Sequence, residues 1–162
     1  MNKNFRWLAF PILLASSALA VQSQDVNLKG RTLCLSPKSV DVSVEGPGKT
    51  NLDNLAQRLY DETVKQFDQN KIAYRAKDNC SADYEVTLSV ESTAGPTRGY
   101  FTRVEVDDNV LPESVYKDYV IIWEDFYYGW TGRADADLED YLFQQGQKSI
   151  KALARAWDDT NT

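Results

Sequence analysis

Residue types that could carry catalysis are limited in this chain of 162 residues, because it contains no histidine. Without an imidazole, neither a Ser-His-Asp nor a Cys-His arrangement can be built, and histidine metal sites and general bases are excluded as well. Carboxylates remain plentiful, but their spacing shows no facing pair of the kind that glycoside hydrolysis needs. We therefore expect a protein without enzyme activity, cofactor or metal.

Two stretches resemble ligand-binding motifs and fail where the chemistry is decided. The acidic run 135–140 suggests an EF-hand, but Asp140 stands where the loop needs Gly and Gly146 where it needs Glu. The segment 46–50 resembles the end of a phosphate loop, but Ser43 occupies the place of its first glycine. Helix capping explains the first stretch, and a turn that leads into a helix explains the second.

An aromatic cluster between residues 116 and 133 is the strongest indication of binding. Tyr, Trp and Arg dominate binding hot spots, and aromatic rings also stack on sugars. Since side chains alternate along a strand, one core-facing set cannot absorb every aromatic here. We expect a binding surface near the end of the sheet formed by Trp123, Tyr127, Tyr128, Trp130 and Arg133. The alternative is that both sheet faces are covered and these rings serve the core.

The cysteines Cys34 and Cys80 are the only two in the chain. An even count in an exported chain predicts a disulfide, since the compartment is oxidising. A metal site is the competing interpretation, but two thiolates without any histidine make a poor ligand set. We expect a Cys34–Cys80 disulfide.

The first twenty residues have the three parts of a cleavable export signal. Lys3 and Arg6 precede an apolar stretch, and Ala18-Leu19-Ala20 matches the A-x-A pattern of a cleavage site. The apolar run is shorter than the roughly 18 residues that a membrane span needs, and no later segment is long or apolar enough to span a bilayer. We expect Sec-type cleavage after Ala20, a periplasmic or secreted location and no stable membrane insertion.

The charge balance restricts the class of partner. The whole chain carries a net charge of −6, and loss of Lys3 and Arg6 with the signal makes the mature charge −8. Nucleic acids and anionic lipids attract concentrated positive charge, so neither is an expected partner. An acidic protein of this kind suits a basic protein partner.

Hydrophobic periodicity predicts the elements that position these residues. Strands are expected at 31–35, 72–75, 83–90, 98–106 and 116–126, and residues 39–44 form a further short strand or an extended edge. One helix is expected from a Thr50 cap to Asn70, and another over 137–157 with Asp137 as its cap. Gly146 is a point where the second helix could break.

These elements predict an α+β fold. A strand–helix–strand unit favours parallel pairing, and the three later strands form an antiparallel meander followed by the C-terminal helix. Two helices then pack on one mixed sheet. We expect a flexible lead-in over 21–29, a single domain over 30–158 and a tail over 159–162.

The order of elements, together with the phrase Ala82-Asp83-Tyr84-Glu85-Val86, resembles a group of small bacterial envelope accessory proteins. This group is similar to the N-terminal domain of TolB and to auxiliary lipoproteins of ABC-type transport systems. The resemblance spans most of residues 30–157, although this chain has no lipobox Cys. It implies a protein that binds other envelope components and is not an enzyme.

The leading hypothesis is therefore an exported binding or accessory protein of the cell envelope, which recognises a protein partner through the aromatic surface around residues 123–133. An inhibitor of a secreted enzyme, or an immunity-type protein, would use the same surface. A glycan-binding or glycan-cleaving protein could use these aromatics with Glu124 or Asp125. The sequence also allows a structural envelope component without a discrete ligand.

Overall fold

The computed structural model describes residues 28–47, 52–76, 79–108 and 120–161. The expected signal segment 1–20, its cleavage site and most of the lead-in lie outside these residues. Within the described residues, no helix is both long enough and apolar enough to cross a membrane.

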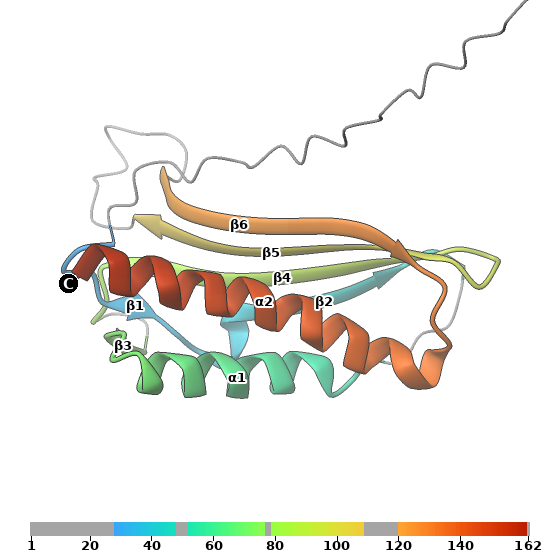
Figure 1. Ribbon diagram of the computed structural model, residues 1–162, viewed down its shortest axis with the longest axis horizontal. Helices are drawn as coiled ribbons and strands as arrows, with labels where there is room; N and C mark the ends of the chain where they lie inside the picture. Colours follow the sequence, from blue (N-terminus) through green and yellow to red (C-terminus); the bar gives the residue numbers. More distant parts are fainter. Residues whose placement is uncertain (1–27, 48–51, 77–78, 109–119, 162) are drawn as a thin grey trace, which may run out of the picture.

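The chain folds into a mixed six-stranded sheet with two long helices, which confirms the predicted α+β architecture (Figure 1). Its strands are β1 (Leu33–Cys34), β2 (Val40–Glu45), β3 (Tyr74–Arg75), β4 (Ala82–Ser92), β5 (Arg98–Asp108) and β6 (Val120–Thr131). Its helices are the short 3₁₀ turn η1 (Pro37–Ser39), α1 (Leu55–Gln69) and α2 (Asp135–Asn161). The strand order is β3-β1-β4-β5-β6, and β2 also pairs with β4.

The N-terminal half of the sheet is parallel, as the strand–helix–strand pattern predicts. β1 lies between β3 and β4 and runs parallel to both, while β2 runs parallel to β4 further along the same edge. Between β1 and β2 the chain turns through η1, which begins at Pro37. Proline has no backbone N–H to give to a sheet, so β1 ends before this residue. The predicted segment 39–44 is thus a true strand.

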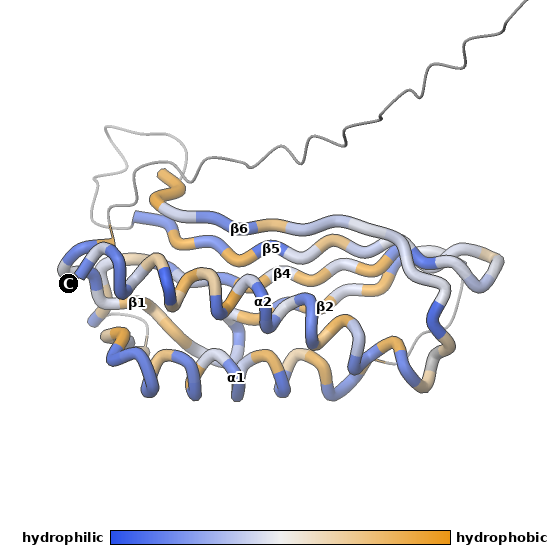
Figure 2. Tube along the Cα trace, viewed as in Figure 1, coloured by the Kyte–Doolittle hydropathy of each residue, from blue (hydrophilic) through white to orange (hydrophobic). Residues whose placement is uncertain are grey.

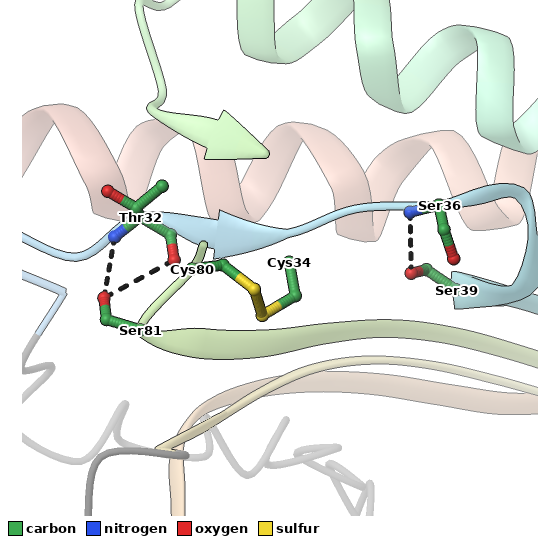
Figure 3. Close-up of a disulfide and its surroundings, with 6 residues drawn as sticks. All are labelled: Thr32, Cys34, Ser36, Ser39, Cys80 and Ser81. Atoms are coloured by element: carbon green, nitrogen blue, oxygen red, sulfur yellow. Dashed lines mark hydrogen bonds between the residues drawn. A yellow bond between two sulfur atoms is a disulfide. The ribbon is translucent and has the colours of Figure 1, made fainter. Parts of the chain in front are cut away.

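The predicted disulfide is confirmed, and it fastens this parallel unit (Figure 3). Cys34 lies in β1, Cys80 lies two residues before β4, and their Cα atoms are 5.1 Å apart. Next to the bridge, the backbone N–H of Thr32 donates to Ser81 Oγ at 2.9 Å, and Ser81 Oγ donates to the Thr32 carbonyl at 3.4 Å (Figure 3). The Ser81 backbone N–H also donates to this carbonyl, at 2.8 Å. Covalent and hydrogen bonds therefore hold β1 against the start of β4.

In the meander of β4, β5 and β6, the first two strands show the expected alternation of apolar and polar residues (Figure 2). From Ala82 to Val90 the even-numbered side chains of β4 are buried against the helices, and the odd-numbered ones are not. The predicted third strand, 116–126, ended too early, since β6 (Val120–Thr131) continues to Thr131; the predicted start, 116–119, lies outside the described residues. The reason is that β5 extends back to Arg98, whose partner in register is Thr131.

The two long helices lie side by side and run in the same direction (Figure 1). α1 begins at Leu55 with Asn54 as its cap, later than the predicted start; Thr50 is not among the described residues. Asn70 ends α1 as expected. α2 begins at Asp135, before the predicted cap Asp137, and continues unbroken through Gly146.

Gly146 serves the contact between the helices. A Cβ atom at this position would lie 2.6 Å from Leu59 Cδ2, so any larger residue would have to displace the end of the Leu59 side chain. Near the first turns of both helices, Arg58 forms ion pairs with Glu139 at 2.7 Å and Asp140 at 2.8 Å. Packing against α1 therefore holds α2 straight where its intrinsic helix propensity is lowest.

The folded domain extends beyond both predicted limits. Leu28, which the sequence placed in the flexible lead-in, is fully buried in the core. At the other end, α2 reaches Asn161, and the Asn161 side chain accepts a hydrogen bond from the Gly30 backbone at 3.1 Å. The expected tail over 159–162 is therefore helical as far as residue 161. The side chains of Thr160 and Asn161 donate hydrogen bonds to carbonyls of the preceding turn of α2, and Asn161 also accepts the bond from Gly30.

Candidate functional site

The helices cover one face of the sheet, and within the described residues the other face, here called the open face, has no helical layer. By register, the open face carries the odd-numbered residues of β2, β4 and β5 and the even-numbered residues of β6 from Glu124 to Trp130. Along the strand direction the open face divides into two halves. The residues of one half are mainly aromatic, and those of the other are mainly acidic.

The aromatic half occupies the end of the sheet where β6 finishes. Tyr128 and Trp130 are 78% and 66% exposed, and Phe101 and Phe126 lie beside them with ring centroids 6.4 Å apart. Large rings this far in water are unusual for an apolar surface that only serves folding. This half therefore has the character of a contact surface.

The structure separates the five residues that the sequence grouped as a binding surface. Tyr128 and Trp130 lie together on the open face. Trp123 and Tyr127 lie on the helix side, where Trp123 is only 7% exposed and belongs to the core. Arg133 follows β6, and its guanidinium lies 4.9 Å from the centre of the Tyr141 ring. Strand alternation is the physical reason, since neighbours in β6 point to opposite faces.

Several residues of the open face were missed in the sequence. Phe101 was counted as an ordinary strand residue, Phe126 belonged to the aromatic cluster but not to the five proposed binding residues, and Glu45 and Glu91 were not singled out. The period of two in β5 was the available signal, since Phe101 alternates with buried Thr102 and Val104. The sequence could not show the strand register, which places Phe101 opposite Tyr128 of β6 and Glu45 opposite Glu91.

The acidic half consists of carboxylates that oppose one another across strands. Glu85, Glu105 and Glu124 stand in one cross-strand row, and Asp83 faces Asp107 in the next. Like charges directly opposite each other destabilise a sheet by roughly 0.2–1 kcal/mol per pair. Arg103 offsets part of this, with ion pairs to Glu105 at 2.5 Å and Glu124 at 3.3 Å.

A cavity of about 440 Å³ opens between this acidic half and the η1 turn, and Lys38 also lines it. Burial raises the pKa of Glu105, and the charge of Asp107 raises it further. Burial also raises the pKa of Asp107, an effect that Arg103 opposes and that Glu85 and Asp83 strengthen. Among the residues that the structure describes, none forms a hydrogen bond with the buried Asp107 Oδ1. The folded protein thus holds these carboxyls in an unfavourable setting when they are ionised.

Both raised pKa values make stability depend on pH in a definite direction. The folded chain holds these protons more tightly than the unfolded chain, so the free energy of unfolding falls as pH rises from about 4 through the raised values. We expect Asp107→Asn to raise it at pH 7 by roughly 0.2–1 kcal/mol, because one member of an opposed pair loses its charge. Urea unfolding at pH 7 and pH 3.5 measures the effect, which should vanish at the lower pH.

Asp41→Asn is the matched control for this prediction. Asp41 is exposed on the same face and pairs in register with the uncharged Thr87. Its substitution changes the net charge equally and should leave the urea midpoint unchanged. A lower midpoint for Asp107→Asn at pH 7 would show that the carboxylate stabilises the fold.

Within the described residues, no three potential metal ligands come together as a metal site. No protein-family model matches the chain, and no curated protein matches it either.

Proposed function

We propose that this chain is an exported binding protein of the cell envelope, which recognises a protein partner through the open face of its sheet. The observation that carries the proposal is the pair of exposed rings, Tyr128 and Trp130, on the face opposite α1 and α2. Rigid aromatic side chains of this kind supply large contact area at low entropic cost. The disulfide and the predicted signal segment support an oxidising compartment outside the cytoplasm.

The charges of the same face indicate the chemistry of the partner. The acidic half lies along the same strands as the aromatic half, and Arg103 is the only Lys or Arg of β4, β5 and β6 on this side. A basic partner surface would offset the repulsion between the opposed carboxylates and would be steered towards them. Apolar contact at one end and positive charge at the other would then fix the orientation of the partner.

Binding explains these features better than catalysis does. Exposed rings and carboxylates spread along three strands can contact a broad partner surface, whereas a catalytic centre needs reactive groups converging on one atom. The resemblance to envelope accessory proteins points in the same direction. The protein is therefore proposed to act through association and not as an enzyme.

Neighbouring residues of β6 allow a sharp test of this face. A photo-crosslinking amino acid placed at Tyr128 faces the open side, and the same group at Tyr127 faces the helix side, although both side chains are exposed. In living cells we expect one stoichiometric protein adduct from position 128 and none from position 127. Equal labelling from both positions, or none from either, would contradict the proposal.

A double substitution measures the contribution of the rings. We expect Tyr128→Ala with Trp130→Ala to weaken binding of the crosslinked partner roughly 30-fold or more, since one hot-spot residue is worth at least about 2 kcal/mol. Tyr127→Ala is the control and should change the affinity by less than about twofold. Titration calorimetry measures all three proteins, and urea unfolding checks that each is folded.

The identity of the adduct separates the remaining alternatives. An envelope component supports an accessory protein, whereas a secreted enzyme that loses activity on binding supports an inhibitor or immunity-type protein. If no protein adduct forms and the chain is instead retained on peptidoglycan and released by soluble fragments, a glycan is the ligand and the protein-partner proposal is wrong.

A further inference from the structure

A hollow of about 270 Å³ lies at the aromatic end of the open face. Two glutamates line one side of it, Glu45 from β2 and Glu91 from β4, and the rings of Tyr128 and Trp130 line the other. Ser89 and Phe101 are also part of its lining. The hollow therefore combines carboxylates with aromatic rings.

Trp130 lines this hollow with its indole packed against the backbone of Gly99. Its partner in register is Gly99, and a Cβ atom there would lie 3.2–3.5 Å from Trp130 Cζ3, Cη2 and Cε3. Nearly equal distances to three atoms of one ring mean that the ring lies flat over the bare backbone of Gly99. One side of the indole is thus covered by the sheet and the other is open to a ligand.

The two glutamates form an opposed pair that lacks a cation. Glu45 and Glu91 are directly across from each other in register, and both are exposed. In the described part of the chain, no Lys or Arg forms an ion pair with either of them. Gly46 follows Glu45 with a φ of 96° and packs on the Ser92 carbonyl, where any Cβ would collide. This contact holds the end of β2, and with it Glu45, close to β4.

From this geometry we infer that the hollow binds an arginine side chain of the partner, an inference that rests on the proposed function. A guanidinium group is planar and stacks on an indole, and its donors reach carboxylates in pairs. A cation also relieves the repulsion between Glu45 and Glu91, which a neutral sugar ring would leave in place. A lysine ammonium is a compact point charge and would use the flat indole surface less well.

Short blocked peptides test this inference without the partner. The probes are acetyl-Gly-Arg-Gly-amide and the same peptide with citrulline, which keeps the shape and loses the charge. We expect the arginine peptide to shift the Trp130 indole N–H and Gly99 amide NMR signals saturably in the oxidised protein. The citrulline peptide should bind at least about tenfold more weakly, the range expected for losing a charged hydrogen bond.

Charge variants show whether the hollow itself is responsible. Glu45→Gln with Glu91→Gln should weaken binding of the arginine peptide at least about tenfold, by the same reasoning. Asp61→Asn with Asp137→Asn is the matched control, because it removes two exposed charges from the helices and should change binding by less than twofold. No saturable shift with the arginine peptide, or an equal loss in both variants, would overturn the inference.

The glutamate variant also separates this inference from the proposed function. If it binds the crosslinked partner as tightly as the unchanged protein does, while the Tyr128/Trp130 variant does not, the open face is the binding surface but no arginine enters the hollow. If neither variant affects the partner, the proposed function itself is wrong.

Discussion

Removal of the Cys34–Cys80 disulfide is expected to lower the free energy of unfolding by about 4 kcal/mol. The bridge closes a loop between residues 46 positions apart, and freeing it returns that loop's entropy to the unfolded chain. The strands it fastens are very short, because β1 and β3 have only two residues each. Few backbone bonds would replace the crosslink, so a fall in melting temperature on the order of 10 °C should accompany the change.

Two preparations isolate the effect of the crosslink. Cys34→Ala with Cys80→Ala removes the bridge and avoids a new buried hydroxyl at Cys34, which is largely buried. The reduced form of the unchanged protein keeps both side chains and lacks only the bond. Urea unfolding should give the same lower midpoint for both. If the oxidised and reduced proteins unfold at the same urea concentration, the bridge does not stabilise the fold.

Gly146→Leu is expected to destabilise the protein by roughly 2–3 kcal/mol through overpacking. Leucine is the better helix former by nearly 1 kcal/mol, so propensity alone predicts the opposite sign. The decisive contact is with Leu59, since even a Cβ at position 146 would lie 2.6 Å from its Cδ2. Leu59 is itself fully buried and has little space in which to move. Thermal unfolding followed by circular dichroism measures the change.

Two comparisons identify the helix contact as the cause. Gln144→Leu adds the same side chain at an exposed position of α2 and should change stability by less than about 0.5 kcal/mol. In a Leu59→Ala background, Gly146→Ala should become stabilising, because the added methyl group then enters vacated space. A stabilising Gly146→Leu in the unchanged protein would mean that the helices can separate without cost.

Hydrophobic periodicity in the sequence was sufficient to predict which helices and strands form, but it predicted their first and last residues less well. Alternation in residues 83–90 and 98–106 predicted two strands, because a half-buried strand imposes a period of two. The end of β6 was missed, because Tyr127, Tyr128 and Trp130 are apolar on both faces and lose that period. Their place in a strand is set by pairing with β5, which is a long-range contact.

For the candidate site too, the local sequence pattern predicted some features, and only the strand register decided the others. The sequence indicated that residues 123–133 contain more rings than one core-facing set can take, and Tyr128 and Trp130 are indeed exposed. It could not show that Glu45 and Glu91 stand opposite each other at the edge of the same hollow. Those residues come from strands separated by α1, so only the parallel pairing of β2 with β4 brings them together.

The sequence by itself determined the fold class, the disulfide pairing and the absence of imidazole chemistry, since each depends on residue type, count or local periodicity. The tertiary structure alone decided which rings share a face, which carboxylates oppose one another and why α2 stays straight at Gly146. These features depend on strand register and on the distance between packed helices. Both are set by contacts between residues far apart in the chain, and local patterns do not encode them.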